Sequence, residues 1–380
     1  MSKALPRPRF ATLDAGVLRT VRRVARNALW LLLSQGGVRL IGFALGTLLA
    51  RWFGVADFGT YVFVLTYVSY FAFLADAGLG RYLIRDVARD RASTHEYLGQ
   101  ITALRLALAL AAYALMLGVS VLTHSSPLLT ASVAVAGLSL FTGAVAGALS
   151  SVFTAREEMH VSALFGVLSS AATAVFVLAA LAAGAGLFGT FVAVSLANLP
   201  PLAYLLIAWR RRDTGPRLRA SRAFWGEALK QSYPYAILGV IGLIYFRIDA
   251  LMLTWMKGSE ANGIYSAAYR LLDAITDAPG VIVAAMFPML ARLHRGSRAK
   301  LRRAYFSVLG VLALLGLPVM IGVFLFADPI IRLLYGSDFE RSVTVLRLLS
   351  VAVFLIFVDT ANTMLLYSGD NLRTVLWLSV

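Results

Sequence analysis

Three arginines lie deep inside long apolar stretches of the chain, where burying a charge is expensive: Arg39, Arg247 and Arg270. An isolated arginine at the centre of a bilayer costs about 2.5–3.5 kcal/mol on insertion scales. Guanidinium groups bind phosphate oxygens in a fixed, two-pronged geometry. We therefore expect these arginines to contact an anionic substrate. The alternative for each is an ion pair that only holds the helices together.

Helical spacing places two of these arginines on polar stripes. One stripe has residues at i, i+4, i+7 and i+11, namely Gln35, Arg39, Gly42 and Gly46. Another follows the same pattern with Ser266, Arg270, Asp273 and Asp277. Such a stripe is expected to face a wet cavity rather than lipid, so Gln35 joins the arginines as a candidate substrate-binding residue.

Acidic residues inside the apolar stretches are candidates for ion coupling, by holding Na⁺ or carrying a proton: Asp249, Asp273, Asp277 and Asp359. Structural pairing is the competing role, in which Arg270 binds Asp273 or Asp277. Arg247 and Asp249 are two residues apart, which predicts nearly opposite faces of one helix. Arg105 and Arg347 lie near the ends of their stretches, where we expect their side chains to reach the membrane interface.

Catalytic chemistry has little basis in this sequence. The chain has no cysteine, and its four histidines fall in predicted loops or near the ends of apolar stretches. Metal-ligand spacing and a nucleophile with a nearby base are both missing from the pattern. We expect no enzyme activity, no metal site and no cofactor, apart from the coupling ion.

The elements that position these residues are predicted to be membrane-spanning helices. The chain is 59% hydrophobic and 14% charged, with a mean hydropathy of +0.78, which is typical of an integral membrane protein. Ten stretches reach the length needed to cross a bilayer. They lie near residues 27–50, 57–80, 99–122, 127–153, 161–184, 187–209, 232–256, 264–290, 304–327 and 343–367.

Basic residues alternate between the gaps that separate these stretches. The N-terminus and every second gap hold 26 of the 35 Lys and Arg residues, whereas the other gaps hold only Arg51, Lys257, Arg332 and Arg341. Positive charge stays cytoplasmic during insertion, so the N-terminus is predicted on the cytoplasmic side. The expected location is a bacterial cytoplasmic membrane. The net charge of +16 favours anionic membrane lipids as partners over nucleic acid.

The most polar gap divides the chain into two predicted lobes. We expect a basic cytoplasmic N-terminus at 1–26, an N-lobe of six helices at 27–209, a basic linker at 210–231 and a C-lobe at 232–380. The C-lobe has four complete helices and the start of a fifth. Because a second lobe of six helices would need two more spans, truncation of the chain is the favoured explanation.

A weak internal repeat supports the two lobes. Gly54, Gly59 and Tyr61 recur after 204 residues as Gly258, Gly263 and Tyr265. Both copies join the first and second helices of their lobe, and the two glycines are expected to permit a tight turn there. Six helices is an even number, so the lobes would enter the membrane in the same direction and place a site between them.

Several short motifs resemble polysaccharide-repeat-unit flippases (Wzx-type) of the multidrug/oligosaccharidyl-lipid/polysaccharide exporter superfamily. They are Asn27-x-x-Trp30, the run RWFGVADFGTY from Arg51 to Tyr61, Asp76-Ala-Gly-Leu79, and the run PIIRLLYGSDF from Pro329 to Phe339. The resemblance implies an all-α polytopic membrane protein, a two-lobed bundle of six plus six transmembrane helices with a central cavity. About ten complete helices are present in this chain.

The resemblance also implies a function. Such proteins move an undecaprenyl-diphosphate-linked oligosaccharide repeat unit from the inner to the outer leaflet by alternating access, for O-antigen, capsule or exopolysaccharide synthesis. Polymerases and other polysaccharide assembly proteins are the implied partners. A multidrug or small-cation exporter of the same superfamily is the alternative, although three deep arginines favour an anionic substrate. A membrane-embedded polymerase or glycosyltransferase is the second alternative, and it would need a sizeable loop or a catalytic base.

Overall fold

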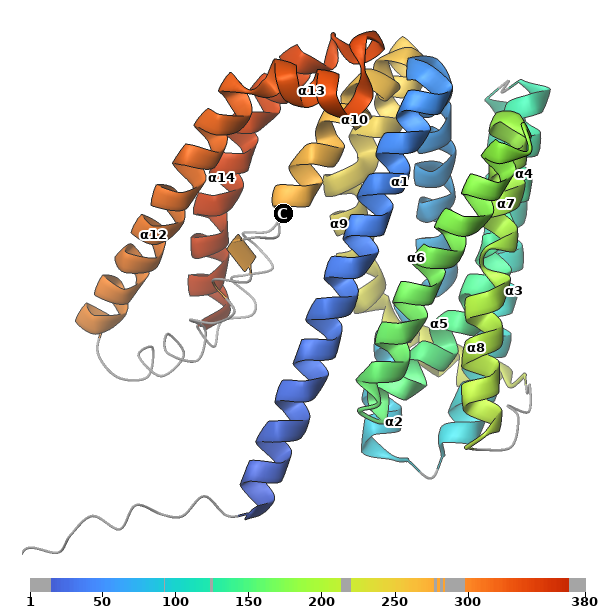
Figure 1. Cartoon of the computed structure of the whole chain (residues 1–380). Coiled ribbons are helices and arrows are strands. Elements are labelled where there is room, and N and C mark those ends of the chain that lie inside the picture. Colours follow the sequence, from blue (N-terminus) through green and yellow to red (C-terminus); the bar gives the residue numbers. More distant parts are fainter. Residues whose placement is uncertain are drawn as a thin grey trace, which may run out of the picture. The chain divides into compact units, whose positions relative to one another are not determined.

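The computed structural model describes residues 15–91, 93–123, 126–212, 220–276, 279–280, 283 and 298–368. Every regular element within these ranges is helical (Figure 1), which confirms the predicted all-α architecture. Eight helices in the described part of the chain are long and apolar enough to cross a membrane.

The difference between eight and the predicted ten has two causes. Helix α1 (Ala15–Asp76) merges the first two predicted spans, because its helical hydrogen bonding resumes directly after a kink at Gly54. The predicted span at 264–290 corresponds to α10 (Ser259–Ile275), whose 17 residues are too few to be counted as a crossing. The rest of that span lies largely outside the described residues.

The kink in α1 has an exact conformational counterpart in the second half of the chain. Gly54 has φ 72° and ψ −175°, and Gly258, which precedes α10, has φ 86° and ψ 174°. This backbone region is essentially restricted to glycine. The two positions related by the internal repeat therefore adopt the same conformation, as expected for equivalent turns.

The chain forms two compact units, which we describe separately. Unit 1 comprises residues 1–42 and 68–243. Its helices, besides parts of α1 and α9 (Arg222–Lys257), are α2 (Leu79–Arg89), α3 (Thr94–Leu122), α4 (Pro127–Gly137), α5 (Ser139–Ala155), α6 (Met159–Ala182), α7 (Gly186–Leu196) and α8 (Leu199–Arg210). The predicted spans at 127–153 and 187–209 are thus each built from two short helices. Helices α2, α3, α5 and α8 share a core around the fully buried Phe153 and Trp209.

Unit 2 comprises residues 43–67 and 244–380. Besides its parts of α1 and α9 it contains α10, α12 (Arg298–Leu325), α13 (Ala327–Tyr335), the 3₁₀ helix η1 (Ser337–Phe339) and α14 (Ser342–Ser368). Helix α14 packs against both α12 and α10, with Leu312 and Phe357 in their shared core. The segment at 328–342, which separates two predicted spans and was expected to be a loop between them, instead contains α13 and η1.

Within unit 2, α1 and α10 approach so closely that only glycine fits at the contact. A Cβ atom on Gly59 would collide with the backbone oxygen of Ser259, and one on Gly263 would collide with the backbone oxygen of Val55. Asn262 adds a hydrogen bond from Nδ2 to the Gly59 oxygen, at 2.9 Å. Gly59 was predicted to serve a tight turn, but it lies inside the helix and is required for this close approach.

Candidate functional site

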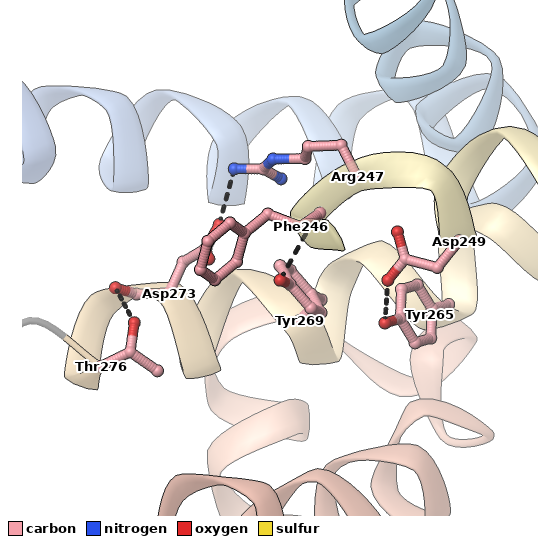
Figure 2. Close-up of polar contacts among 7 residues, drawn as sticks. All are labelled: Phe246, Arg247, Asp249, Tyr265, Tyr269, Asp273 and Thr276. Carbon is pink, nitrogen blue, oxygen red and sulfur yellow. Dashed lines mark hydrogen bonds and ion pairs between the residues drawn. The ribbon is translucent and has the colours of Figure 1, made fainter. Parts of the chain in front are cut away.

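Helices α9 and α10 form an antiparallel pair that carries a row of polar contacts (Figure 2). Arg247 Nη2 lies 2.9 Å from Asp273 Oδ2 in an ion pair whose side chains are 45% and 39% exposed. The same guanidinium lies over the ring of Tyr269, 5.6 Å from its centroid. Arg247 is therefore held at a surface of unit 2 by two partners and remains open to a third.

A second acidic group lies one turn further along this pair. The Tyr265 hydroxyl donates to Asp249 Oδ2, while the Ala250 backbone N–H donates to Asp249 Oδ1 at 2.7 Å. Figure 2 shows Arg247 and Asp249 both reaching α10. The two residues were predicted on nearly opposite faces of α9. Both side chains nevertheless contact α10, because α10 runs back along α9.

The other α10 arginine has different surroundings. The Arg270 guanidinium lies against Gly46 of α1, where a Cβ atom would collide with it, and over the ring of Phe58 at 5.6 Å from the centroid. The predicted stripe of α10 is thus divided: Arg270 contacts α1, whereas Asp273 contacts Arg247 on α9. Gly46 belongs to the other predicted stripe, so residues from both stripes meet here.

The remaining predicted site residues are not joined to this cluster by the contacts within unit 2. Gln35 and Arg39 have exposed side chains on the part of α1 that belongs to unit 1. Asp359 is exposed on α14, and Asp277 lies outside the described residues. No group of three or more His, Cys, Asp or Glu side chains that could hold a metal ion occurs among the residues searched in the described ranges.

Arg105 does not reach the membrane interface as predicted, because it is buried inside unit 1. Its side chain is 5% exposed and Nη2 forms an ion pair with Asp76 Oδ1. Two glycines make room for the guanidinium: a Cβ on Gly147 would lie 2.6 Å from Nη1, and one on Gly80 would lie 3.1 Å from Nη2. Two predicted spans ending in opposite charges at the same side of the membrane were the sequence signal for this pair. Arg347 is exposed, with its guanidinium 5.8 Å from the ring centroid of Phe324.

Comparisons with known proteins place this arrangement in a family. A family model described as polysaccharide biosynthesis protein matches residues 24–294. The succinoglycan biosynthesis transport protein ExoT of Rhizobium meliloti is 22% identical over 335 residues, which are 87% of this chain and 66% of ExoT. The probable lipid II flippase MurJ of Bdellovibrio bacteriovorus is 24% identical over 187 residues, or 46% of this chain and 35% of that protein.

A third relative is the teichuronic acid biosynthesis protein TuaB of Bacillus subtilis, 24% identical over 124 residues, which are 32% of this chain and 26% of TuaB. The chain therefore spans between about a quarter and two thirds of the lengths of these curated relatives. These shares describe only the aligned regions.

Solved structures share the fold. The lipid II flippase MurJ in an inward closed conformation superposes with a TM-score of 0.77 at 12% identity, covering 92% of this chain and 78% of that one. An inward-facing multidrug resistance MATE family transporter of the MOP superfamily gives 0.70 at 16% identity, covering 90% and 83%. The fold is thus that of MOP-superfamily transporters, and the protein is a multi-pass membrane protein. Because the family model matches well over half of the chain, the protein belongs to the polysaccharide biosynthesis protein family.

Proposed function

We propose that the protein is a flippase that moves an undecaprenyl-diphosphate-linked oligosaccharide from the inner to the outer leaflet of a bacterial cytoplasmic membrane by alternating access. The alternation of basic residues supports an N-terminus on the cytoplasmic side. The names of the relatives, a succinoglycan transport protein and a lipid II flippase, support a lipid-linked sugar as the substrate class. The polymer built from it would be an O-antigen, a capsule or an exopolysaccharide.

The observation that carries this proposal is the exposure of the Arg247 side chain. An arginine in an apolar helix normally has its charge enclosed by partners, yet this side chain is 45% exposed beside Asp273. A diphosphate oxygen can replace the carboxylate or add to it, since a guanidinium presents five N–H donors. Arg39, exposed on the part of α1 that belongs to unit 1, is proposed independently as a contact for the diphosphate or the sugars.

The test is translocation of a defined undecaprenyl-diphosphate oligosaccharide in proteoliposomes. One charged hydrogen bond is worth about 1.5–3 kcal/mol, so Arg247→Ala and Arg39→Ala should each slow transport about 10- to 100-fold. Arg247→Lys should recover part of the loss, because lysine keeps the charge without the two-pronged geometry. Arg347→Ala is the matched control and should leave the rate unchanged. Full transport by both Arg247→Ala and Arg39→Ala would contradict the assignment.

A second candidate function is export of an organic cation, and one observation favours it. The α9–α10 cluster gathers two aspartates and two tyrosines around a single arginine, so it has one more negative than positive charge: Arg247, Asp249, Tyr265, Tyr269 and Asp273. Acidic and aromatic groups together bind cations. The same proteoliposomes, loaded with a lipophilic organic cation in place of the lipid-linked sugar, separate the two candidates.

Imposed gradients test the coupling ion. We propose that Na⁺ or H⁺ drives transport through the candidate acidic residues Asp249, Asp273, Asp277 and Asp359. An inward Na⁺ gradient and an inward proton gradient are compared at equal driving force, with Asp249→Asn and Asp273→Asn as the variants of the described cluster. A rate that responds to neither gradient would remove the coupling role from these aspartates.

A further inference from the structure

Two of the motifs that mark the family resemblance, residues 51–61 and 329–339, contact each other inside unit 2. Arg51 Nε donates to the backbone oxygen of Leu334 at 2.8 Å, and Arg51 Nη2 donates to that of Leu333. Arg51 lies three residues before the kink of α1 at Gly54, and the two oxygens lie in the last turn of α13. Residues from two motifs that are far apart in the sequence therefore form one contact.

The contact is chemically specific, because it caps the end of a helix. The last carbonyls of a helix have no partner within it and carry the negative end of the helix dipole. A guanidinium satisfies both oxygens at once. Helix α13 ends at Tyr335, and the following Gly336 has φ 89°, so the chain turns away just after the capped carbonyls. Arg51 thus fixes the end of α13 against α1.

An aromatic contact strengthens the same junction. Phe339 of η1 is fully buried, with its ring edge-on to Phe58 of α1 at 6.0 Å between centroids. Tyr335 lies 5.5 Å from the Phe339 ring and is itself buried. The contact to α1 consequently depends on one arginine and one ring pair.

The other side of this segment is fixed to α10. Arg341 Nη1 lies 3.1 Å from Glu260 Oε1, and the buried Ser342 hydroxyl donates to the Ile264 oxygen at 2.8 Å. We name α13, η1, Arg341 and Ser342 the α13 clasp. It contacts both copies of the internal repeat, α1 through Arg51 and Phe58, and α10 through Glu260 and Ile264.

The two attachments differ in strength. On the α10 side the clasp continues into α14, which packs against α10. On the α1 side the exposed Arg51 can exchange its carbonyl partners for water at little cost, since exposed polar contacts contribute little to stability. The apolar contact on the α1 side is the buried Phe58–Phe339 pair, whereas the α10 side keeps the packing of α14. The α1 side is therefore the one that can open without unfolding unit 2.

We propose that the α13 clasp is a latch: it stays attached to α10 and α14, and it releases Arg51 of α1 when the protein opens toward the side that the charge pattern places outside. This inference rests on the proposed alternating access. In that scheme the first-half helix α1 and the second-half helix α10 must separate at this end, where the clasp joins them.

Cysteine bridges test the latch, and the chain has no native cysteine to interfere. The variant R51C/L333C places thiols on the α1 side, where Leu333 is 75% exposed, and a short cleavable bismaleimide joins them. E260C/R341C, bridged by the same reagent, ties the clasp to α10 and is the matched control. Deuterium exchange of the amides at 55–67 and 259–275, and translocation of the lipid-linked sugar, are measured before bridging, after bridging and after cleavage of the bridge.

The R51C/L333C bridge should slow both exchange and translocation about tenfold or more, with recovery on cleavage, whereas the control bridge should change neither. Unchanged exchange in bridged R51C/L333C, or an equal effect of both bridges, would overturn the latch. Slowed exchange in a protein that moves no lipid-linked sugar in any form would leave the latch standing and contradict the proposed substrate.

A single substitution covers the case in which R51C/L333C does not fold. Arg51→Gln keeps a donor but loses the charge and the second prong. Amides of residues 328–336 should then exchange about threefold faster or more than in the parent. Equal exchange in the parent and Arg51→Gln would show that Arg51 does not hold the clasp, and the latch would be rejected.

Discussion

Two arginine–aspartate pairs in this molecule are alike in chemistry and opposite in surroundings. In unit 1 the Arg105 side chain is 5% exposed beside Asp76, and in unit 2 the Arg247 side chain is 45% exposed beside Asp273. The first arginine is enclosed by protein, as expected of an ion pair that holds the fold together. The second can exchange its carboxylate for another anion. Enclosure, rather than the number of residues from the end of a span, separates a structural arginine from one available to a ligand.

Asp76→Asn should give the largest effect on stability, because it leaves the enclosed Arg105 without a negative partner. Breaking a buried ion pair from one side costs about 3–5 kcal/mol. Thermal and denaturant unfolding of the purified protein in detergent micelles measures this loss. Asp76→Asn/Arg105→Met is the control and should recover most of it, since an apolar replacement of a buried pair is often neutral. A single variant as stable as the parent would break the comparison.

Gly147→Ala should give an intermediate effect. A methyl group would lie 2.6 Å from Arg105 Nη1, so the guanidinium or α5 must shift, at about 1–3 kcal/mol. Gly143→Ala, one turn earlier in α5, has no atom within 4 Å of the added carbon. It should be neutral or stabilise by about 0.5–1 kcal/mol through helix propensity. Equal unfolding midpoints for the two variants would show that the Arg105 site is not tightly packed.

Asp273→Asn should have the smallest effect on stability. The Arg247 side chain that it leaves behind is 45% exposed, and exposed pairs contribute about 0–1 kcal/mol. The unfolding midpoint in the same micelles should stay close to that of the parent. A loss of stability as large as that of Asp76→Asn would mean that both pairs hold the fold. It would contradict the proposal that Arg247 is available to bind a ligand.

The sequence was sufficient for the helical class and for most of the apolar spans, but not for the breaks within spans or for the contacts between them. Apolar length and turn residues predicted the helices, because each depends on a continuous local pattern. Arg105 was misplaced because distance from a span end does not reveal that Asp76, Gly80 and Gly147 converge on it. Arg247 and Asp249 were predicted on nearly opposite faces of one helix, and that spacing gave no sign that α10 contacts them both. Contacts between segments far apart in the chain are decided by packing, which no local spacing encodes.

The contact between α13 and α1 could not be predicted from local sequence either. The motifs at 51–61 and 329–339 were recognisable as resemblances, yet nothing in either run indicates that Arg51 caps the helix formed by the other. A loop was predicted at 328–342 because its polar residues interrupt the apolar pattern. An amphipathic helix of 9 residues has the same composition, and only its position beside α1 distinguishes the two.

The glycine contact of α1 and α10 is made twice with the roles exchanged. Gly59 meets the Ser259 oxygen and Gly263 meets the Val55 oxygen. Gly263 follows Gly59 by 204 residues, and Ser259 follows Val55 by the same 204. This is an isologous interface, the kind formed by a twofold homodimer, contained within a single polypeptide. A substitution at Gly59 or Gly263 therefore changes a contact in which the equivalent residue of the other copy also takes part. The two copies nevertheless differ beside this contact, because Phe58 in the first copy corresponds to Asn262 in the second, and Asn262 donates to the Gly59 oxygen.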